Sequence, residues 1–268
     1  MTITEPLVMG ILNVTPDSFY AGSRSDTTQA IEARVGQMLA EGVDIIDVGA
    51  YSTRPGAVVV TADEEKARLA RATEVIHRFA PNVVTSVDTF RADVARYAVE
   101  QLGIGIVNDV SGGTLDPQMF ATVADLQVPY ILMHMRGTPA TMQQLTDYDN
   151  VVDDVLRDLR GKLDTLRGMG VRDVVVDPGF GFAKTLQQNY ELMARLEEFH
   201  SLRAPLLVGI SRKSMIYKTL NCTPDEALNG TTVLNTVALL AGAHILRVHD
   251  VLAAVEARTL IKSMYNKY

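Results

Sequence analysis

The sequence contains eight short apolar runs, and a residue that can take part in chemistry follows each of them closely. The runs lie at 11–12, 45–46, 83–84, 106–107, 131–132, 174–176, 206–208 and 245–246. The residues that follow are Asn13, Asp47, Asp88, Asn108, His134, Asp177, Lys213 and Arg247. In a parallel eight-stranded barrel the carboxyl ends of the strands share one face, and that face carries the chemistry. The pattern therefore predicts both a fold class and the place of a site.

Helical periodicity fills the segments between these runs. Apolar residues recur at helical spacing over 27–41, 91–102, 117–126, 151–169, 186–199 and 251–265. Thr61 and Glu64 have the spacing of a capping box, which predicts a helix over 61–79. Pro224 after Thr223 indicates a further helix start. Strand and helix thus alternate eight times, which implies parallel crossovers.

The expected strands are rich in Val, Ile and Leu and lack polar alternation, as is typical of strands covered by helices. A doubly wound open sheet would give similar local signals. Eight repeats of similar length, without a division into halves, favour a closed barrel. The 268 residues also match the ~250 of such folds. We expect an α/β protein: a single (β/α)8 TIM-barrel domain over 1–268, with long loops after strands one and two.

Composition excludes several classes of protein. The chain has 25 basic and 32 acidic residues, a net charge of -7, whereas general nucleic-acid binding needs a basic face. Cys222 is the only cysteine, so no intrachain disulfide can form, which agrees with a reducing cytoplasm. The first residues lack the pattern of a secretory signal, and no apolar run is long enough to span a membrane. We expect a cytoplasmic protein.

Acid and amide side chains form the first candidate set: Asp88, Asn108 and Asp177. Each taken alone has an alternative role as a helix N-cap or turn former. Three such residues at one end of a barrel favour a pocket for a flat heterocycle with several N–H donors. The carboxylate of Asp177 suits a guanidine-like edge, which it would accept through two parallel hydrogen bonds.

Basic residues form the second candidate set, which comprises Arg247 and His249 together with Asn13, Lys213 and Arg212. Loops after strands seven and eight of such barrels often bind phosphate, and the planar guanidinium of arginine matches phosphate oxygens. The alternative is a surface salt-bridge cluster. The segment 52–56, Ser-Thr-Arg-Pro-Gly, is either a plain turn or a basic lid above the pocket. Dinucleotide, Walker A and zinc-site spacings are absent from the sequence.

Seven ordered segments resemble dihydropteroate synthase, a folate-pathway family with a pterin-binding barrel. They read Met-Gly-Ile-Leu-Asn-Val-Thr-Pro-Asp-Ser-Phe at 9–19, Ser-Thr-Arg-Pro-Gly at 52–56, Ser-Val-Asp-Thr at 86–89, Asn-Asp-Val-Ser-Gly at 108–112, Asp-Pro-Gly-Phe-Gly-Phe at 177–182, Ser-Arg-Lys at 211–213 and Arg-Val-His at 247–249. The resemblance runs through nearly the whole chain. It implies the joining of 6-hydroxymethyl-7,8-dihydropterin diphosphate to p-aminobenzoate, with release of pyrophosphate, in a Mg²⁺-dependent homodimer that sulfonamides inhibit.

The resemblance also implies a role for individual residues. The pterin site would consist of Asp88, Asn108, Met133, Asp177 and Lys213. The pyrophosphate site would consist of Asn13, Arg247 and His249, with Asn13 also at the metal. The p-aminobenzoate site would consist of Phe19, Thr53, Arg54, Pro55, Phe182 and Ser211, with Lys213 beside them. Lys213, Arg247, Asp177 and Asp17 would be the residues of the catalytic centre.

Two loops depart from the pattern of the family. Many members read Ser-Asp-Gly-Gly where this chain has Tyr-Ala-Gly-Ser at 20–23, and Gly-Glu where it has Ala50 and Tyr51. The aspartate of that first loop can stabilise a cationic intermediate, and Ala21 cannot. Asp17 is the expected substitute.

Two other functions compete with the synthase. Methyltransferases that pass a methyl group from methyltetrahydrofolate to a corrinoid share the pterin-binding barrel, but they need neither 52–56 nor 211–213. A paralogue that binds pterin without synthesis would fit Ala21 and Tyr51. An active synthase agrees best with the chemistry, because an aryl amine is nucleophilic at neutral pH without a strong base. A dissociative substitution is expected, in which Mg²⁺, Arg247 and His249 absorb the charge of the leaving group.

Overall fold

The structure is a computed structural model that describes residues 3–15, 24–51 and 60–265. Its strands are β1 (Leu7–Asn13), β2 (Ile45–Gly49), β3 (Val84–Asp88), β4 (Ile106–Asp109), β5 (Tyr130–Met133), β6 (Val174–Asp177), β7 (Leu207–Val208) and β8 (Ile245–Val248). They pair in parallel in the order β6-β5-β4-β3-β2-β1-β8-β7. An isolated parallel bridge between Val176 and Leu206 joins the two ends of this order. The expected TIM barrel is confirmed.

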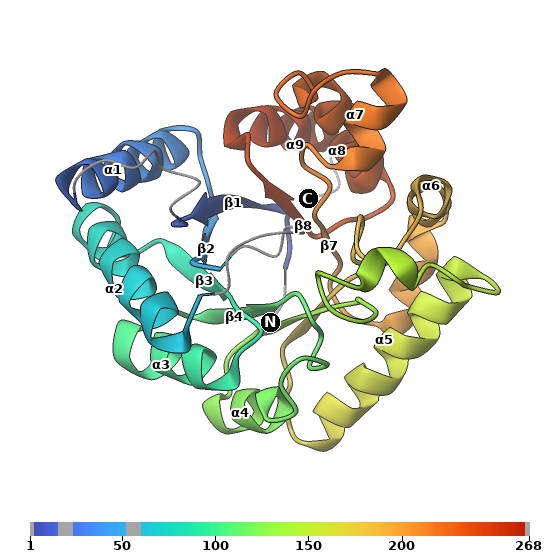
Figure 1. Cartoon of the computed structure of the whole chain (residues 1–268). Helices are drawn as coiled ribbons and strands as arrows, with labels where there is room; N and C mark the ends of the chain where they lie inside the picture. Colours follow the sequence, from blue (N-terminus) through green and yellow to red (C-terminus); the bar gives the residue numbers. More distant parts are fainter. Residues whose placement is uncertain (1–2, 16–23, 52–59, 266–268) are drawn as a thin grey trace.

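Helices surround the strands on the outside (Figure 1). They are α1 (Arg24–Ala40), α2 (Ala62–Phe79), α3 (Ala92–Leu102), α4 (Met119–Leu126), α5 (Val151–Gly168), α6 (Leu186–Ala194), α7 (Ser214–Leu220), α8 (Leu228–Leu240) and α9 (Val251–Tyr265). Two short 3-10 helices, Met142–Gln144 and Leu196–Leu202, complete the described elements. Within the described ranges, no helix is long and apolar enough to cross a membrane.

Most expected helices are confirmed, and three details differ. The Thr61 side chain accepts from the Glu64 amide at 3.2 Å and caps α2 as expected. The expected helix over 186–199 ends early, because the backbone leaves helical geometry at Arg195 and continues as a 3-10 helix. Glu226 accepts from both the amide and the hydroxyl of Thr223, so this segment forms a turn and α8 starts only at Leu228. Helix α7 was not expected.

The barrel interior has an apolar floor. Its members come from seven strands and pack against one another: Met9, Ile45, Ile106, Ile131, Val175, Leu207 and Ile245. Side chains alternate between the two faces of a strand, so the residues two positions further along line the same interior one layer higher. These are Ile11, Asp47, Asn108, Met133, Asp177, Gly209 and Arg247. The period of the strand therefore places a polar layer directly above the apolar floor, toward the carboxyl ends.

Candidate active site

A hydrogen-bonded network around Arg247 occupies this polar layer. Its Nε donates to Oδ2 of Asp47 at 2.7 Å, and its Nη2 donates to Oδ2 of Asp88 at 2.5 Å. The side-chain amide of Asn108 donates to the same Asp47 oxygen at 3.0 Å. Asn108 on β4 and Arg247 on β8 thus meet through Asp47 on β2, and Arg247 joins Asp88 on β3 to them.

Asp47 is the functional residue that the candidate sets lack. It follows an apolar run and lies two positions after the floor residue Ile45, and this alternation was the signal that could have found it. Its side chain is fully buried. Oδ1 has no hydrogen-bond partner among the described residues. We infer that Asp47 fixes the orientation of Arg247 and Asn108 from below.

Charge in this network is set by burial and by the pairing of ions. Burial lowers the pKa of Arg247, but Asp47 and Asp88 raise it above its ordinary value, so the guanidinium stays charged. Burial raises the pKa of Asp88, and the neighbouring Asp47 adds to that rise, while Arg247 opposes it. The net effect raises the pKa of Asp88 to about 7, and the ion pair with Arg247 is the main interaction that favours the ionised form.

Asn13, Gly49, Asp88 and Asn108 lie in one row across β1 to β4, because these residues are register partners. A Cβ on Gly49 would lie 3.1 Å from Oδ1 of Asn13 and 3.7 Å from Oδ2 of Asp88. Because Gly49 has no side chain, the space beside it stays open, and both oxygen atoms face this space. The structure thus brings the Asn13 amide beside the Asp88 carboxylate.

Asp177 and Lys213 form the other side of the site. Asp177 is buried, and its Oδ1 accepts from the amide of Gly179 at 2.7 Å. Burial raises the pKa of Asp177, while Lys213, the Gly179 amide and Arg247 lower it. Lys213 Nζ donates to the carbonyl of Phe180 at 2.6 Å and lies 4.8 Å from the Phe182 ring centroid. Burial lowers the pKa of Lys213 to about 8, against the opposing effect of Asp177.

Met133 and Phe182 supply apolar surface next to these charges. Met133 is the register partner of Asp177 and packs in a small cluster with Phe182. Phe180, by contrast, is fully buried in the core between barrel and helices. Phe182 is the partly buried partner of Lys213 and can pack on a flat ligand.

His249 and Ser211 lie together after β8 and β7. The Nδ1 atom of His249 is 3.0 Å from Oγ of Ser211, which also accepts from the His249 amide at 3.1 Å. Arg212 has a different role from the one expected. Its Nε and Nη2 bind both oxygens of Asp250 at 2.8 and 2.9 Å, and Nη1 donates to the carbonyls of Pro224 and Asp225. These bonds occupy the guanidinium of Arg212 in holding loops together, so Arg212 is not a residue of the anion site.

Five of the expected site residues lie outside the described residues: Asp17, Phe19, Thr53, Arg54 and Pro55. The ends of the second long loop are described. Arg68 donates to the carbonyl of Ala50 at 3.2 Å, and Arg91 donates to the carbonyl of Val60 at 2.7 Å. Tyr51 packs edge-on against Phe90, and the Arg91 guanidinium lies 5.2 Å from its ring. Helices α2 and α3 thus hold both ends of this loop at the rim of the barrel.

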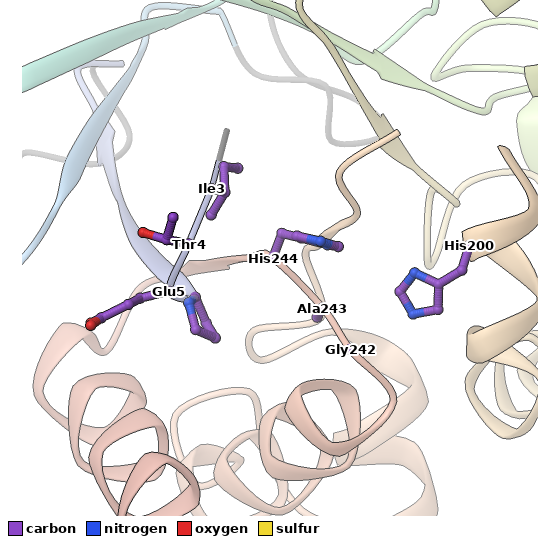
Figure 2. Close-up of a pocket in the computed structure, with 8 residues that line it drawn as sticks. Ile3, Thr4, Glu5, His200, Gly242, Ala243 and His244 are labelled. Carbon is purple, nitrogen blue, oxygen red and sulfur yellow. The ribbon is translucent and has the colours of Figure 1, made fainter. Parts of the chain in front are cut away.

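A cavity of about 290 Å³ lies at the opposite end of the barrel, where β1 and β8 begin (Figure 2). Glu5, His200 and His244 are among its lining residues. His200 Nε2 bonds the carbonyl of Ala241 at 2.9 Å, and His244 Nδ1 accepts from the amide of Leu206 at 3.1 Å. Both rings thus bond backbone groups. None of the candidate residues lines this cavity.

Comparisons with known proteins agree with the geometry at the carboxyl end. A family model described as pterin binding enzyme matches residues 9–249. The dihydropteroate synthase of Escherichia coli K12 is 42% identical over 266 residues, which cover 98% of this chain and 93% of that protein. The structure of Yersinia pestis dihydropteroate synthase with a sulfonamide complex superposes with a TM-score of 0.90 at 36% identity and covers 100% and 97% of the two chains. The Xanthomonas albilineans dihydropteroate synthase in complex with 7,8-dihydropteroate gives 0.85 at 33% identity, with 98% and 94% covered.

Proposed function

The chain belongs to the dihydropteroate synthases, a family of pterin-binding enzymes, and from this premise we propose how its residues carry out the reaction of that family. The enzyme is a transferase that condenses 6-hydroxymethyl-7,8-dihydropterin diphosphate with p-aminobenzoate, giving 7,8-dihydropteroate and pyrophosphate for folate biosynthesis. The observation that carries the proposal is the polar layer of the barrel, where buried Asp47, Asn108 and Asp177 and partly buried Asp88 and Arg247 face one interior.

The pterin ring is assigned to Asp88, Asn108, Met133, Asp177 and Lys213. The outer oxygen of Asp177 accepts from the amino-pyrimidinone edge of the pterin, and Lys213 donates to a ring acceptor. Burial excludes water from these bonds, which strengthens them. Met133 packs on the ring face. Together these groups orient the exocyclic carbon that carries the diphosphate.

The diphosphate is assigned to Asn13, Arg247 and His249. Bond cleavage leaves a carbon that the electron-rich dihydropterin stabilises, while negative charge gathers on the departing pyrophosphate. A guanidinium held in place by Asp47 and Asp88 does not need to reorganise as that charge develops, so its stabilisation is available in the transition state. This arrangement favours a dissociative substitution.

The donor set beside Gly49 fits Mg²⁺, which we propose as the cofactor. The amide oxygen of Asn13 and the carboxylate of Asp88 are hard oxygen ligands facing one space. Mg²⁺ takes few protein ligands and completes its shell with water and substrate phosphates, so the lack of a cluster of three acidic or His residues in the described chain does not argue against this fit. Bound there with the diphosphate, the ion would neutralise part of its charge.

The p-aminobenzoate is assigned to Phe182 and Ser211, together with Phe19, Thr53, Arg54 and Pro55, and Asp17 is proposed for the catalytic centre. The ring of Phe182 is already oriented by the ammonium of Lys213. The neutral aryl amine attacks the carbon from which pyrophosphate has departed and then loses a proton. No side chain with the role of a strong base is required.

Release of pyrophosphate tests this function. The purified protein should release one pyrophosphate per dihydropteroate formed when both substrates and Mg²⁺ are present, and much less when p-aminobenzoate is omitted. Binding of the pterin diphosphate without any turnover would instead favour a paralogue that binds pterin but has lost synthesis.

Pterin affinity is expected to fall as the pH rises through about 8, because Lys213 loses its positive charge over that range. A charged donor contributes more to a hydrogen bond than a neutral one. Titration calorimetry with 6-hydroxymethylpterin between pH 7 and 9.5 would measure the change. The Lys213→Arg variant keeps its charge over this range, so its affinity should change less with pH; an equal decline in both proteins would contradict the role of Lys213.

We propose a homodimer of single-domain chains, 1–268, in the cytoplasm. Helix α8 carries Val233, Val237 and Leu240, which are exposed and lie on one helical stripe. Leu260 and Met264 on the neighbouring α9 are 66% and 69% exposed (Figure 1). Apolar side chains gathered on adjacent helices are typical of a protein interface. A second copy of the chain is the proposed partner.

The Val237→Glu/Leu260→Glu variant is expected to be monomeric at micromolar concentration, where the wild-type protein is dimeric. Two carboxylates buried without partners would oppose association. Sedimentation equilibrium measures the mass directly. Leu145→Glu is the matched control, since this leucine is also exposed but lies outside α8 and α9. If the double variant remains dimeric, the contact lies on another surface.

A further inference from the structure

Lys184 is a buried lysine beside the proposed pterin site. It follows β6 directly before α6, and its side chain is only 3% exposed. The Nζ atom lies 2.9 Å from the carbonyl oxygens of Gly179 and Phe182 and 3.0 Å from Nδ1 of His134. An ammonium group has three N–H donors, and here each has one acceptor.

Burying the ammonium group of Lys184 costs free energy, so a functional reason for it is expected. Moving an ammonium group out of water carries a large penalty that three neutral acceptors offset only in part. A methionine would fill similar space without that cost. The lysine therefore does something that apolar packing does not do.

The three acceptors connect Lys184 to the residues of the site. Gly179 and Phe182 belong to the loop after Asp177, in which Gly179, Gly181 and Ala183 all have positive φ. The amide of Gly179 donates to Asp177 at 2.7 Å, so a donor on the Gly179 carbonyl fixes the same peptide segment that orients the carboxylate. The Phe182 carbonyl belongs to the residue whose ring packs on Lys213.

His134 provides the third contact and fixes the opposite side. Its ring is almost fully buried, and its backbone amide donates to the carbonyl of Asp177 at 3.0 Å. Burial and the neighbouring Lys184 lower the pKa of His134 to about 2, so the ring is neutral and can accept at Nδ1. A Cβ on Gly179 would lie 2.0 Å from the His134 carbonyl, which shows how closely the two segments approach.

We propose that Lys184 is a positioning residue for the synthase reaction: its ammonium group holds the 178–183 loop against His134 and so keeps the Asp177 carboxylate and the Phe182 ring oriented for the substrates. This inference rests on the proposed pterin pocket. Lys184 does not touch the reacting atoms and acts through Asp177 and Phe182.

The charge of Lys184 also acts on Asp177, which is buried as well. The charged and titratable groups that face Lys184 are Asp177 on β6, His134 and Arg136 after β5, Asp158 on α5 and Lys213 after β7. Burial lowers the pKa of Lys184 to about 7, and Asp177 opposes that change. In return, Lys184 is one of the cations that favour the ionised form of Asp177. Its removal should move the acid-side loss of pterin binding to higher pH.

The test compares Lys184→Met with the wild-type protein in titration calorimetry with 6-hydroxymethylpterin from pH 5 to 9. The variant is expected to have a Kd at least roughly tenfold higher at neutral pH. Its acid limb, the loss of affinity as the pH falls, should also begin at a higher pH. His134→Leu removes one acceptor and should weaken binding in the same direction. His134→Asn places an amide oxygen near the position of Nδ1 and should restore most of the affinity.

Two controls separate this inference from others. Lys218→Met removes an exposed lysine of α7 and should leave the Kd and its pH profile unchanged. Asp177→Asn tests the pocket itself: unchanged affinity in that variant would overturn the proposed pterin site. If Asp177→Asn weakens binding while folded Lys184→Met keeps the wild-type Kd and acid limb, the positioning role is overturned. Should Lys184→Met not fold, an unchanged Kd in His134→Leu would have the same consequence.

Discussion

The Arg247→Met variant is expected to lose about 3–5 kcal/mol of its free energy of unfolding at neutral pH and nearly all synthase activity. The loss of stability follows from the two carboxyl groups that Arg247 pairs with, since the side chain of Asp47 is fully buried and that of Asp88 is only 15% exposed. Without the guanidinium, both carboxyl groups lose their cationic partner inside the barrel. Urea unfolding followed by circular dichroism measures the free energy.

The loss of stability in Arg247→Met is expected to depend on pH. Burial already raises the pKa of Asp88, and the loss of Arg247 would raise it further above its unfolded value. A carboxyl group with a raised folded pKa costs stability above that pKa, and the cost disappears as the pH falls below the unfolded value. The deficit of Arg247→Met should therefore shrink toward pH 4.

Arg258→Met is the matched control for the loss of an arginine–carboxylate pair. Arg258 pairs with Asp44 and has the same 19% side-chain exposure as Arg247, but Asp44 is 31% exposed. Solvent can therefore reach the carboxylate that remains, and a loss of about 1 kcal/mol is expected, with activity retained. A loss of the same size in both variants would mean that Asp47 and Asp88 are not held by Arg247 in solution.

The Asp177→Asn variant is expected to fold normally and to bind the pterin roughly ten- to a hundredfold more weakly. A hydrogen bond to a charged group contributes about 1.5–3 kcal/mol, and the variant loses that charge at the pterin edge. The amide oxygen of asparagine can still accept from Gly179, so the loop keeps its local bond. Calorimetry with 6-hydroxymethylpterin gives the affinity.

Stability should not fall in Asp177→Asn. Because burial raises the pKa of Asp177, its ionised form costs stability above that pKa, and asparagine removes this cost. Asp125→Asn on α4 is the control, because its carboxylate is 70% exposed and pairs with Arg96 at the surface. A variant that binds pterin as tightly as the wild type would show that Asp177 serves only the turn at Gly179.

The barrel and its polar layer could be predicted because both depend on short sequence spacings. Apolar runs mark the strands, and the two-residue period leads from four of the floor residues to Asp47, Asn108, Asp177 and Arg247 above them. Helix α7 was missed because seven residues, of which only Met215 and Ile216 are buried, give too little periodicity. The start of α8 was misplaced because Glu226 caps a turn instead of the helix.

The connections between site residues could not be predicted. Asp47 bonds Asn108 and Arg247, which lie 61 and 200 positions away in the chain, so its central place depends on strand register rather than on local pattern. Lys184 belongs to a residue type that is seldom buried, and nothing local distinguishes it from a surface lysine. The contacts in the folded chain therefore reveal the role of Asp47 and the burial of Lys184.

The way in which the barrel closes between β6 and β7 has a consequence for local opening of the structure. This edge is joined by an isolated bridge at Val176 and Leu206 rather than by a ladder. Asp177 stands on one side of it and Lys213 on the other, and Lys213 crosses it to reach the Phe180 carbonyl. A pterin that contacts both residues acts as a cross-link over this seam. Backbone amides along it should exchange hydrogen more slowly in the complex, so that the substrate itself completes the rigidity of its own binding site.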